Sequence, residues 1–195
     1  MFNSIRRYTR WLHTRWPAGV VEKLPESGKG GLTNIPGVRI VGDLTGIPLL
    51  KFSSKTGAEA VHAILAEPDF RSGDGERTRN EDGVLDLAII GGGVSGVSAA
   101  IEARKAGLTF KIFEATQPFS TVANFPRAKP IYTYPSELKL RGGLHFTKDV
   151  KESLLEEMEE QRRAAGIEFT PVRIERLEAC ASEILLHHGG EDVTP

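Results

Sequence analysis

The feature that most constrains the fold is a glycine-rich turn, Gly91–Gly96, with the spacing G-x-G-x-x-G. Alone this spacing is weak evidence because glycine is common, but its context is specific. The turn follows a mainly apolar run of six residues, LDLAII (85–90), and Gly107 lies where a helix that begins at the turn would end. A second apolar run then reaches an acid, Glu114, 23 residues after Gly91. This order predicts a strand–turn–helix–strand unit that binds a dinucleotide.

Each glycine of such a turn has a physical role. Gly91 permits the tight turn out of the strand, Gly93 lets the backbone approach a pyrophosphate, and Gly96 lets the helix lie close to the sheet. Backbone N–H groups at the helix start then face the phosphates. The predicted cofactor-binding residues of the turn are Gly91, Gly92, Gly93, Val94, Ser95 and Gly96.

Glu114 is the predicted partner of the adenosine ribose in this unit. Its carboxylate would accept hydrogen bonds from the ribose hydroxyls, as an acid at the end of the second strand does in dinucleotide-binding domains. An acid there disfavours a 2′-phosphate. The pattern therefore favours FAD or NAD over NADP at this site.

A second informative stretch, residues 37–43, reads GVRIVGD and predicts a short buried strand that ends in Gly42 and Asp43. Residues 53–67 follow after a loop and have the periodicity of a helix. A carboxylate and helix N–H groups between a strand end and a helix can form hydrogen bonds with a polyhydroxylated ligand. A Gly-Asp pair after a strand is equally the composition of an ordinary turn, so the residues alone leave both interpretations open.

Composition excludes several classes of protein. The 25 Lys and Arg residues against 26 Asp and Glu give a net charge of −1, without the basic excess of a nucleic-acid binder. No run approaches the roughly 18 apolar residues of a membrane-spanning helix. The single cysteine, Cys180, excludes an intrachain disulfide, a CxxC redox pair and a Cys-based zinc site. The five histidines lack metal-ligand spacing, so we predict no metal site, and we name no catalytic side chain.

The two glycine and acid motifs resemble those of FAD-dependent pyridine nucleotide oxidoreductases with two dinucleotide-binding domains. That family includes the thioredoxin reductases and the bacillithiol disulfide reductases. The stretch LDLAIIGGGVSGVSAAIEARKAGLTFKIFEA resembles its first FAD motif, and IPGVRIVGD resembles its second. FSTVANFPRAKPIYTYPSEL resembles the loop after the second strand in the bacillithiol disulfide reductase type. The resemblance covers about residues 31–65 and 85–190.

The resemblance implies that Asp43, with Gly42 beside it, contacts the ribityl and pyrophosphate region of FAD. The chain differs from the family in order, because the Gly-Asp motif comes near the C-terminus there and comes first here. It also has a single G-x-G-x-x-G and no dithiol pair. We expect residues 31–65 to pack beside 85–115 and to complete one FAD site in permuted order.

These patterns predict an α/β protein: a Rossmann-like FAD/NAD(P)-binding domain with a parallel sheet and a small antiparallel β addition. The expected segments are a basic N-terminal extension, 1–30, the Gly-Asp segment, 31–65, a charged and glycine-rich linker, 66–84, and an incomplete Rossmann-like domain, 85–195. A charged helix is expected over about 147–165, followed by two or three short strands.

The resemblance implies an oxidoreductase module that passes electrons from NAD(P)H through FAD to an unidentified acceptor. We expect a dinucleotide as small-molecule partner, a homodimer or an electron-acceptor protein as macromolecular partner, no nucleic acid, and a cytoplasmic location. Two alternatives stay open. One is a non-catalytic dinucleotide-binding or interaction fragment, and the other is a single-domain NAD-dependent dehydrogenase.

Overall fold

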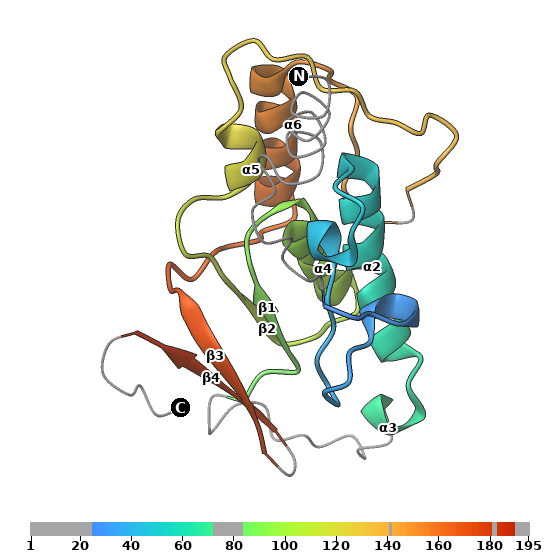
Figure 1. The fold of residues 1–195 in the computed structure, drawn as a ribbon, viewed down its shortest axis with the longest axis vertical. Helices are drawn as coiled ribbons and strands as arrows, with labels where there is room; N and C mark the ends of the chain where they lie inside the picture. The colour runs from blue at the N-terminus through green and yellow to red at the C-terminus, as the bar shows by residue number, and fades with distance from the viewer. Residues whose placement is uncertain (1–24, 72–83, 141, 181–182, 190–195) are drawn as a thin grey trace, which may run out of the picture.

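The computed structural model describes residues 25–71, 84–140, 142–180 and 183–189. A central β–α–β unit is flanked by a long helix on one side, by a helix and loop at one end and by a hairpin at the other (Figure 1). In chain order the elements are η1 (Lys29–Gly31), η2 (Gly42–Thr45), α2 (Leu50–Leu65), α3 (Pro68–Arg71), β1 (Leu87–Ile90), α4 (Val94–Lys105), β2 (Phe110–Phe113), α5 (Ser120–Ala123), α6 (Lys151–Ala164), β3 (Ile174–Ala179) and β4 (Ile184–His188).

The central unit consists of β1, α4 and β2, as the glycine-rich motif predicts. The two strands pair in parallel, with Leu87 opposite Phe110 and Ile89 opposite Ile112. Ile89 and Ile112 are buried, whereas Ile90, the next residue of β1, is exposed. This alternation turns one face of the pair toward the core, because successive strand residues point to opposite faces. The expected α/β fold with a parallel sheet is confirmed.

The chain after α6 extends the free edge of β2. Thr170 forms a parallel bridge with Phe113. Its N–H group donates to the carbonyl oxygen of Ile112 at 2.7 Å, and the N–H group of Glu114 donates to the carbonyl oxygen of Thr170 at 3.0 Å. Thr170 thus occupies a third strand position of the sheet, directly beside the end of β2.

Helix α4 is buried on nearly all sides because β1 and β2 cover one side of it and α2 covers another. The contact between α2 and α4 is made by small residues. A Cβ atom added to Gly57 would lie 2.1 Å from the carbonyl oxygen of Ser95, so the two backbones touch. Nearby, the buried hydroxyls of Ser54 and Ser98 lie 3.2 Å apart. The small side chains of the two helices therefore allow the N-terminal segment to pack onto the β–α–β unit.

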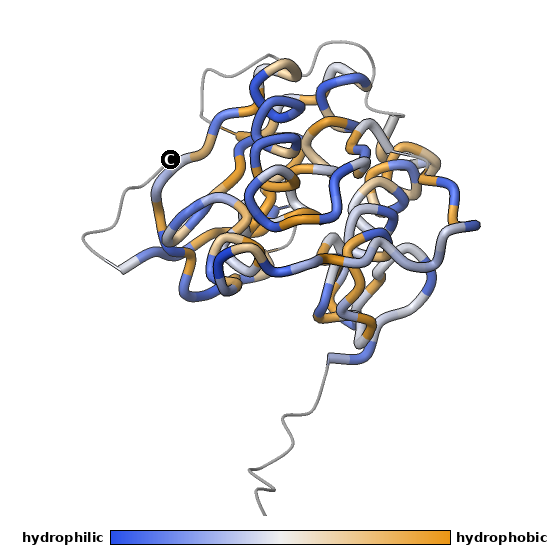
Figure 2. Tube along the Cα trace, turned by 90° about the horizontal axis from the view of Figure 1, so that it is seen from above, coloured by the Kyte–Doolittle hydropathy of each residue, from blue (hydrophilic) through white to orange (hydrophobic). Residues whose placement is uncertain are grey.

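Helix α6 contributes Leu154 and Met158 to the same core, and both side chains are fully buried. The core also contains Phe119, Leu144 and Ile167 from the loops on either side. Hydrophilic and hydrophobic residues alternate along the helices (Figure 2). The expected charged helix over 147–165 is thus present, although it begins later, at Lys151.

The small antiparallel addition is the hairpin of β3 and β4, with Leu177 opposite Leu186. The pairing shifts register between Ile174 and Arg176. Two strands form where two or three were expected.

The strand expected over residues 37–43 is not present. Within the described residues this stretch has one isolated bridge, between Leu32 and Arg39, and the chain then enters η2 at Gly42. The positive φ of Gly42, 73°, is incompatible with an extended strand end. A strand also needs a neighbouring ladder to form, and the bridge pairs the segment with itself.

Two expectations fall partly outside the described residues. Residues 1–24 of the N-terminal extension and residues 72–83 of the linker are not described, and α3 occupies the start of the linker. In the part of the chain that the structure covers, no helix has the length and apolar character needed to cross a membrane.

Candidate dinucleotide-binding site

The three glycines of the G-x-G-x-x-G pattern have different surroundings. Gly91 has a φ of 101°, and its N–H group donates to the carbonyl oxygen of Phe113 at 2.8 Å, which ties the turn to β2. A Cβ atom added to Gly91 or Gly93 would meet nothing within 4 Å. On Gly96 it would lie 2.0 Å from the carbonyl oxygen of Gly91. Gly91 and Gly93 therefore border open space, and Gly96 permits the helix to contact the end of the strand.

The start of α4 can bind an anion. Gly93 is the N-cap residue, and no side chain caps the helix. The first N–H groups of a helix have no intrahelical acceptor, and the positive end of the helix dipole lies there. Since the space beside Gly93 is open, a diphosphate can approach this backbone closely, which is the arrangement found at helix N-termini that bind phosphate.

Gly92, unlike Gly91 and Gly93, has no open space beside its α-carbon. A Cβ atom added to it would lie 2.6 Å from the ring of Phe169. Its N–H group donates to Oε2 of Glu114 at 2.6 Å. Gly92 therefore serves the site through its backbone, by holding Glu114 beside the turn.

Val94 and Ser95 were also predicted to bind the cofactor, and their side chains lie elsewhere. Val94 is buried in the hydrophobic core. Ser95 faces the N-terminal segment: its hydroxyl oxygen would be 2.5 Å from a Cβ atom on Gly42, and its carbonyl oxygen lies against Gly57. For both residues, the part that can meet a ligand is the backbone N–H group at the start of the helix.

Glu114 is a preorganised acceptor at the end of β2. Its Oε1 accepts hydrogen bonds from the N–H group and the hydroxyl of Thr116, at 2.8 and 3.0 Å, while Oε2 accepts from Gly92. Burial raises the pKa of Glu114, but the hydrogen bonds from Thr116 and Gly92 outweigh burial and hold the pKa below its ordinary value. The carboxylate is therefore ionised at neutral pH, the form that accepts hydrogen bonds from ribose hydroxyls.

The Gly-Asp turn lies directly against the glycine-rich turn. Gly42 is buried and packs on Ser95, whereas Asp43 is exposed. The N–H group of Gly42 donates to Oγ1 of Thr56 at 2.9 Å, and Oδ1 of Asp43 accepts from the hydroxyl of Ser53 at 2.7 Å. The structure thus brings together two turns that are about 50 residues apart in the chain.

Sequence reasoning missed the residues that hold the Gly-Asp turn, namely Ser53, Thr56 and Gly57. A signal for them exists in the sequence. The hydroxyl residues Ser53 and Thr56 are three positions apart, and Gly57 follows, so all three come from the first two turns of the predicted helix. Hydroxyls with that spacing point to one side of a helix, the side that faces back to the turn.

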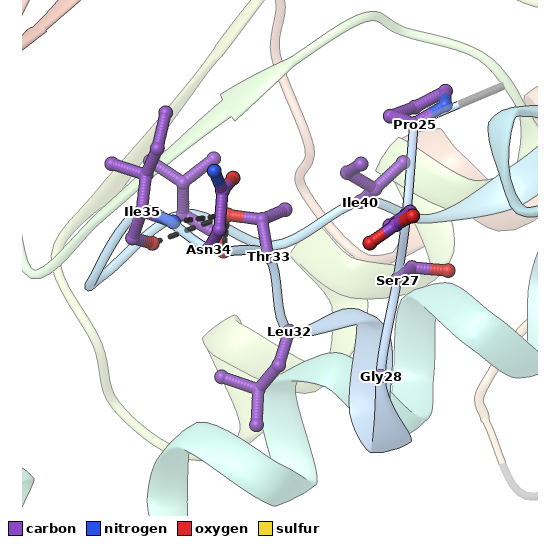
Figure 3. Close-up of a pocket in the computed structure, with 10 residues that line it drawn as sticks. Pro25, Ser27, Gly28, Leu32, Thr33, Asn34, Ile35 and Ile40 are labelled. Carbon is purple, nitrogen blue, oxygen red and sulfur yellow. Dashed lines mark hydrogen bonds between the residues drawn. The ribbon is translucent and has the colours of Figure 1, made fainter. Parts of the chain in front are cut away.

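A separate hollow of about 700 Å³ lies in the N-terminal segment and is lined by residues from 25 to 40 (Figure 3). Its walls include the aliphatic side chains of Leu32, Ile35 and Ile40. The hydroxyl of Thr33 is engaged within the turn, since it accepts from the N–H group of Ile35 at 3.1 Å. None of the predicted cofactor-binding residues lines this hollow, and we assign it no part in dinucleotide binding.

Among the described residues there is no group of three or more His, Cys, Asp and Glu side chains that could hold a metal ion. The candidate site offers backbone N–H groups, open space beside Gly91 and Gly93, and the carboxylates of Glu114 and Asp43.

Comparison with known proteins places these features in context. The family described as FAD binding domain matches residues 86–192, which is more than half of the chain. No curated protein matches the sequence. Among solved structures, the bacillithiol disulfide reductase Bdr from Staphylococcus aureus is similar with a TM-score of 0.45 and 18% sequence identity, over 53% of this chain and 33% of the reductase. The chain thus spans about a third of the length of that structure.

Proposed function

The chain belongs to the FAD binding domain family, and from this premise we propose that it is an oxidoreductase module that binds FAD and receives electrons from NAD(P)H. Bound FAD would supply the redox chemistry, since flavins carry hydride transfer in such proteins. The polypeptide would bind and orient the cofactor, and the electron acceptor is a further molecule.

The observation that carries the proposal is the open space beside Gly91 and Gly93 at the uncapped start of α4. Side chains of neighbouring elements could have filled this place, as Phe169 does beside Gly92. Space beside a glycine backbone at a helix N-terminus fits a pyrophosphate, which needs close backbone approach and N–H donors. The residues present therefore fit the diphosphate of FAD.

We assign the carboxylates to the two sides of that diphosphate. Glu114, held by Gly92 and Thr116, would bind the adenosine ribose. Asp43, with Gly42, would meet the ribityl side of FAD, as the resemblance to the second FAD motif implies. In this assignment the segment 31–65 and the domain 85–195 form one site in permuted order, joined by the linker 66–84.

The remaining parts of the proposal concern partners. NADH or NADPH would be the electron donor, and a homodimer or an electron-acceptor protein would be the macromolecular partner. We propose a cytoplasmic location.

The experiment that tests the function is a visible spectrum of the purified protein with and without NADH or NADPH under anaerobic conditions. An absorbance band near about 450 nm that bleaches on addition of the nucleotide is the expected result. A colourless protein that binds NAD indicates the single-domain dehydrogenase instead. A protein that binds FAD but is never reduced by either nucleotide is a non-catalytic cofactor-binding fragment.

The variant Gly93→Val locates the cofactor. We expect it to lose FAD during purification while it stays folded, because the new side chain projects into open space and blocks the diphosphate. Gly28→Val is the matched control, since a Cβ atom there meets nothing closer than 3.7 Å and lies outside the site. Flavin content is measured by absorbance, and folding by circular dichroism. Wild-type flavin content in Gly93→Val would contradict the assignment.

A further inference from the structure

Two hydroxyl residues in the first turns of α2 hold the Gly-Asp turn in one conformation. Ser53 donates from Oγ to Oδ1 of Asp43 at 2.7 Å. Thr56 accepts the N–H group of Gly42 at 2.9 Å and donates from the same Oγ1 to the carbonyl oxygen of Ser53 at 3.0 Å. Ser53 is 6% exposed. These bonds form one chain that runs from α2 to the carboxylate.

The Asp43 carboxylate is otherwise open. Asp43 is exposed, and within the described part of the chain its side chain has one hydrogen-bond partner, Ser53, on Oδ1. Its backbone is also fixed, because its carbonyl oxygen accepts from the N–H group of Gly46 at 2.9 Å. The oxygen Oδ2 therefore remains for a ligand, on a side chain whose position is already set.

We infer that Ser53 is a positioning residue: it orients the Asp43 carboxylate so that Oδ2 is presented to the hydroxyl-bearing flavin half of FAD. The inference rests on the proposed function. An exposed aspartate free to change rotamer would lose conformational entropy on binding, and a partner that fixes it beforehand removes that cost. Ser53 need not touch the cofactor to raise its affinity.

This role predicts a selective effect. The glycine-rich turn and Glu114 serve the ADP half of FAD, whereas Asp43 serves the flavin half. Loss of the Ser53 hydroxyl should therefore weaken the binding of FAD and leave the binding of ADP unchanged. A charge-assisted hydrogen bond is among the stronger ones, so we expect the dissociation constant for FAD to rise about tenfold.

Ser54 provides a matched control on the same helix. It is also a buried serine, and its hydroxyl contacts Ser98 and not the Gly-Asp turn. Ser54→Ala removes a hydroxyl from the contact between α2 and α4 without freeing Asp43. A purely structural effect of a lost serine would appear in Ser54→Ala as well.

The experiment measures the dissociation constants of FAD and of ADP by calorimetry on the apoprotein, together with the melting temperature. The variants are Ser53→Ala, Ser53→Cys, Ser53→Thr and Ser54→Ala. Ser53→Cys keeps the shape of the side chain and replaces the strong donor by a weak one, so it tests the inference even where Ser53→Ala fails to fold. We expect Ser53→Ala and Ser53→Cys to lose affinity for FAD but not for ADP, and Ser53→Thr to recover the affinity for FAD. In Ser54→Ala the ratio of the FAD and ADP dissociation constants should be unchanged.

A double-mutant cycle with Asp43→Ala shows whether Ser53 acts through Asp43. Ser53→Ala should cause no further loss of FAD affinity once the carboxylate is absent. Equal losses of FAD and ADP, additive effects in the cycle, or the same FAD-selective loss in Ser54→Ala would each overturn the inference while the proposed function stands. A wild-type protein that binds ADP but not FAD would overturn the proposed function itself, and the inference with it.

Discussion

At the scale of single residues, the glycines of the G-x-G-x-x-G pattern separate into two kinds. Gly91 and Gly93 leave space that no atom of the described chain fills, and Gly96 lets two backbones touch. The first kind would serve the proposed ligand, and the second serves the fold. Substitutions at the first kind should therefore weaken FAD binding, and substitutions at the second should lower the stability of the fold.

Gly96→Ala should destabilise the protein. Alanine in place of glycine inside a helix ordinarily adds about 1 kcal/mol of stability, but here the new Cβ atom would lie 2.0 Å from the carbonyl oxygen of Gly91. Overpacking of this kind costs about 1–3 kcal/mol, and we expect a net loss in the free energy of unfolding measured with urea. Gly93→Ala is the control, and its loss should stay within about 1 kcal/mol. A more stable Gly96→Ala variant would contradict the close contact of α4 with the turn.

The spacing of the motif predicted which glycines belong to the turn and that Glu114 lies beside it. It could not show that Gly92 faces Phe169 or that Ser95 faces Gly42. Those neighbours come from distant parts of the chain. Whether a side chain at the turn points to a ligand or to another element depends on what packs there, and spacing within the motif carries no information about it.

At the scale of elements, the junction of α2 and α4 depends on a buried carboxylate. Glu102 on α4 is 7% exposed. Its carboxylate accepts hydrogen bonds from Lys105 at 2.7 Å and from the N–H group of Gly143 at 2.9 Å, and it lies 2.9 Å from Nε2 of His62 on α2. One side chain thus joins α4 to α2 and to the loop before α6.

Glu102→Gln should lower the free energy of unfolding at neutral pH by about 2 kcal/mol, because hydrogen bonds to a charged acceptor are replaced by weaker ones. Glu59→Gln is the control on α2, where the partner Lys55 lies 3.7 Å away at the surface, and it should change stability by less than about 0.5 kcal/mol. Chemical denaturation of both variants measures the difference. Equal stability of Glu102→Gln and wild type would mean that the carboxylate does not join the two helices.

Glu102 also makes the stability of the protein depend on pH. Burial raises the pKa of Glu102, but the bonds from Lys105, His62 and Gly143 outweigh it and lower the pKa below its ordinary value. A lowered folded pKa means that the stabilisation is present above the unfolded value, about 4.3, and is lost as the pH falls through the folded value. The stability difference between wild type and Glu102→Gln should therefore shrink below about pH 4.3.

The elements that the sequence predicted well are those with local causes. Helices α2 and α6 follow from periodicity, α4 follows from the glycine-rich turn before it and Gly107 after it, and β1 and β2 lie in mainly apolar runs. The prediction of a strand over 37–43 was wrong. A strand depends on a neighbouring strand to pair with, and the apolar run gave no information on whether one would lie beside it. The contact of α2 with α4 was expected from the resemblance to a two-motif FAD site, not from the pattern of either helix.

At the scale of the whole molecule, the unusual feature is that α2, which precedes the β–α–β unit in the chain, packs on α4 so closely that the two backbones touch. The packing face of α2 consists of Ser53, Ser54, Gly57, Ala58, Ala60 and Val61, which are all buried. Lys51, at the N-terminal end of α2, adds a hydrogen bond from Nζ to the carbonyl oxygen of Pro135 at 3.0 Å. These contacts, and not the covalent linker, would hold the two parts of the proposed site together.

A protease site inserted between residues 72 and 83 tests this view of the molecule. After cleavage we expect the two pieces to elute together in size exclusion and to keep their FAD, because the junction of α2 and α4 buries small side chains in close contact and includes the Glu102 cluster. Combining the cut with Glu102→Gln should release the N-terminal piece at lower urea concentration than the cut alone, since both changes weaken the same junction. The cut protein with Glu59→Gln should behave as the cut protein alone. Separation of the pieces without denaturant would show that the linker holds the segments together, and loss of FAD without separation would show that the linker itself shapes the site.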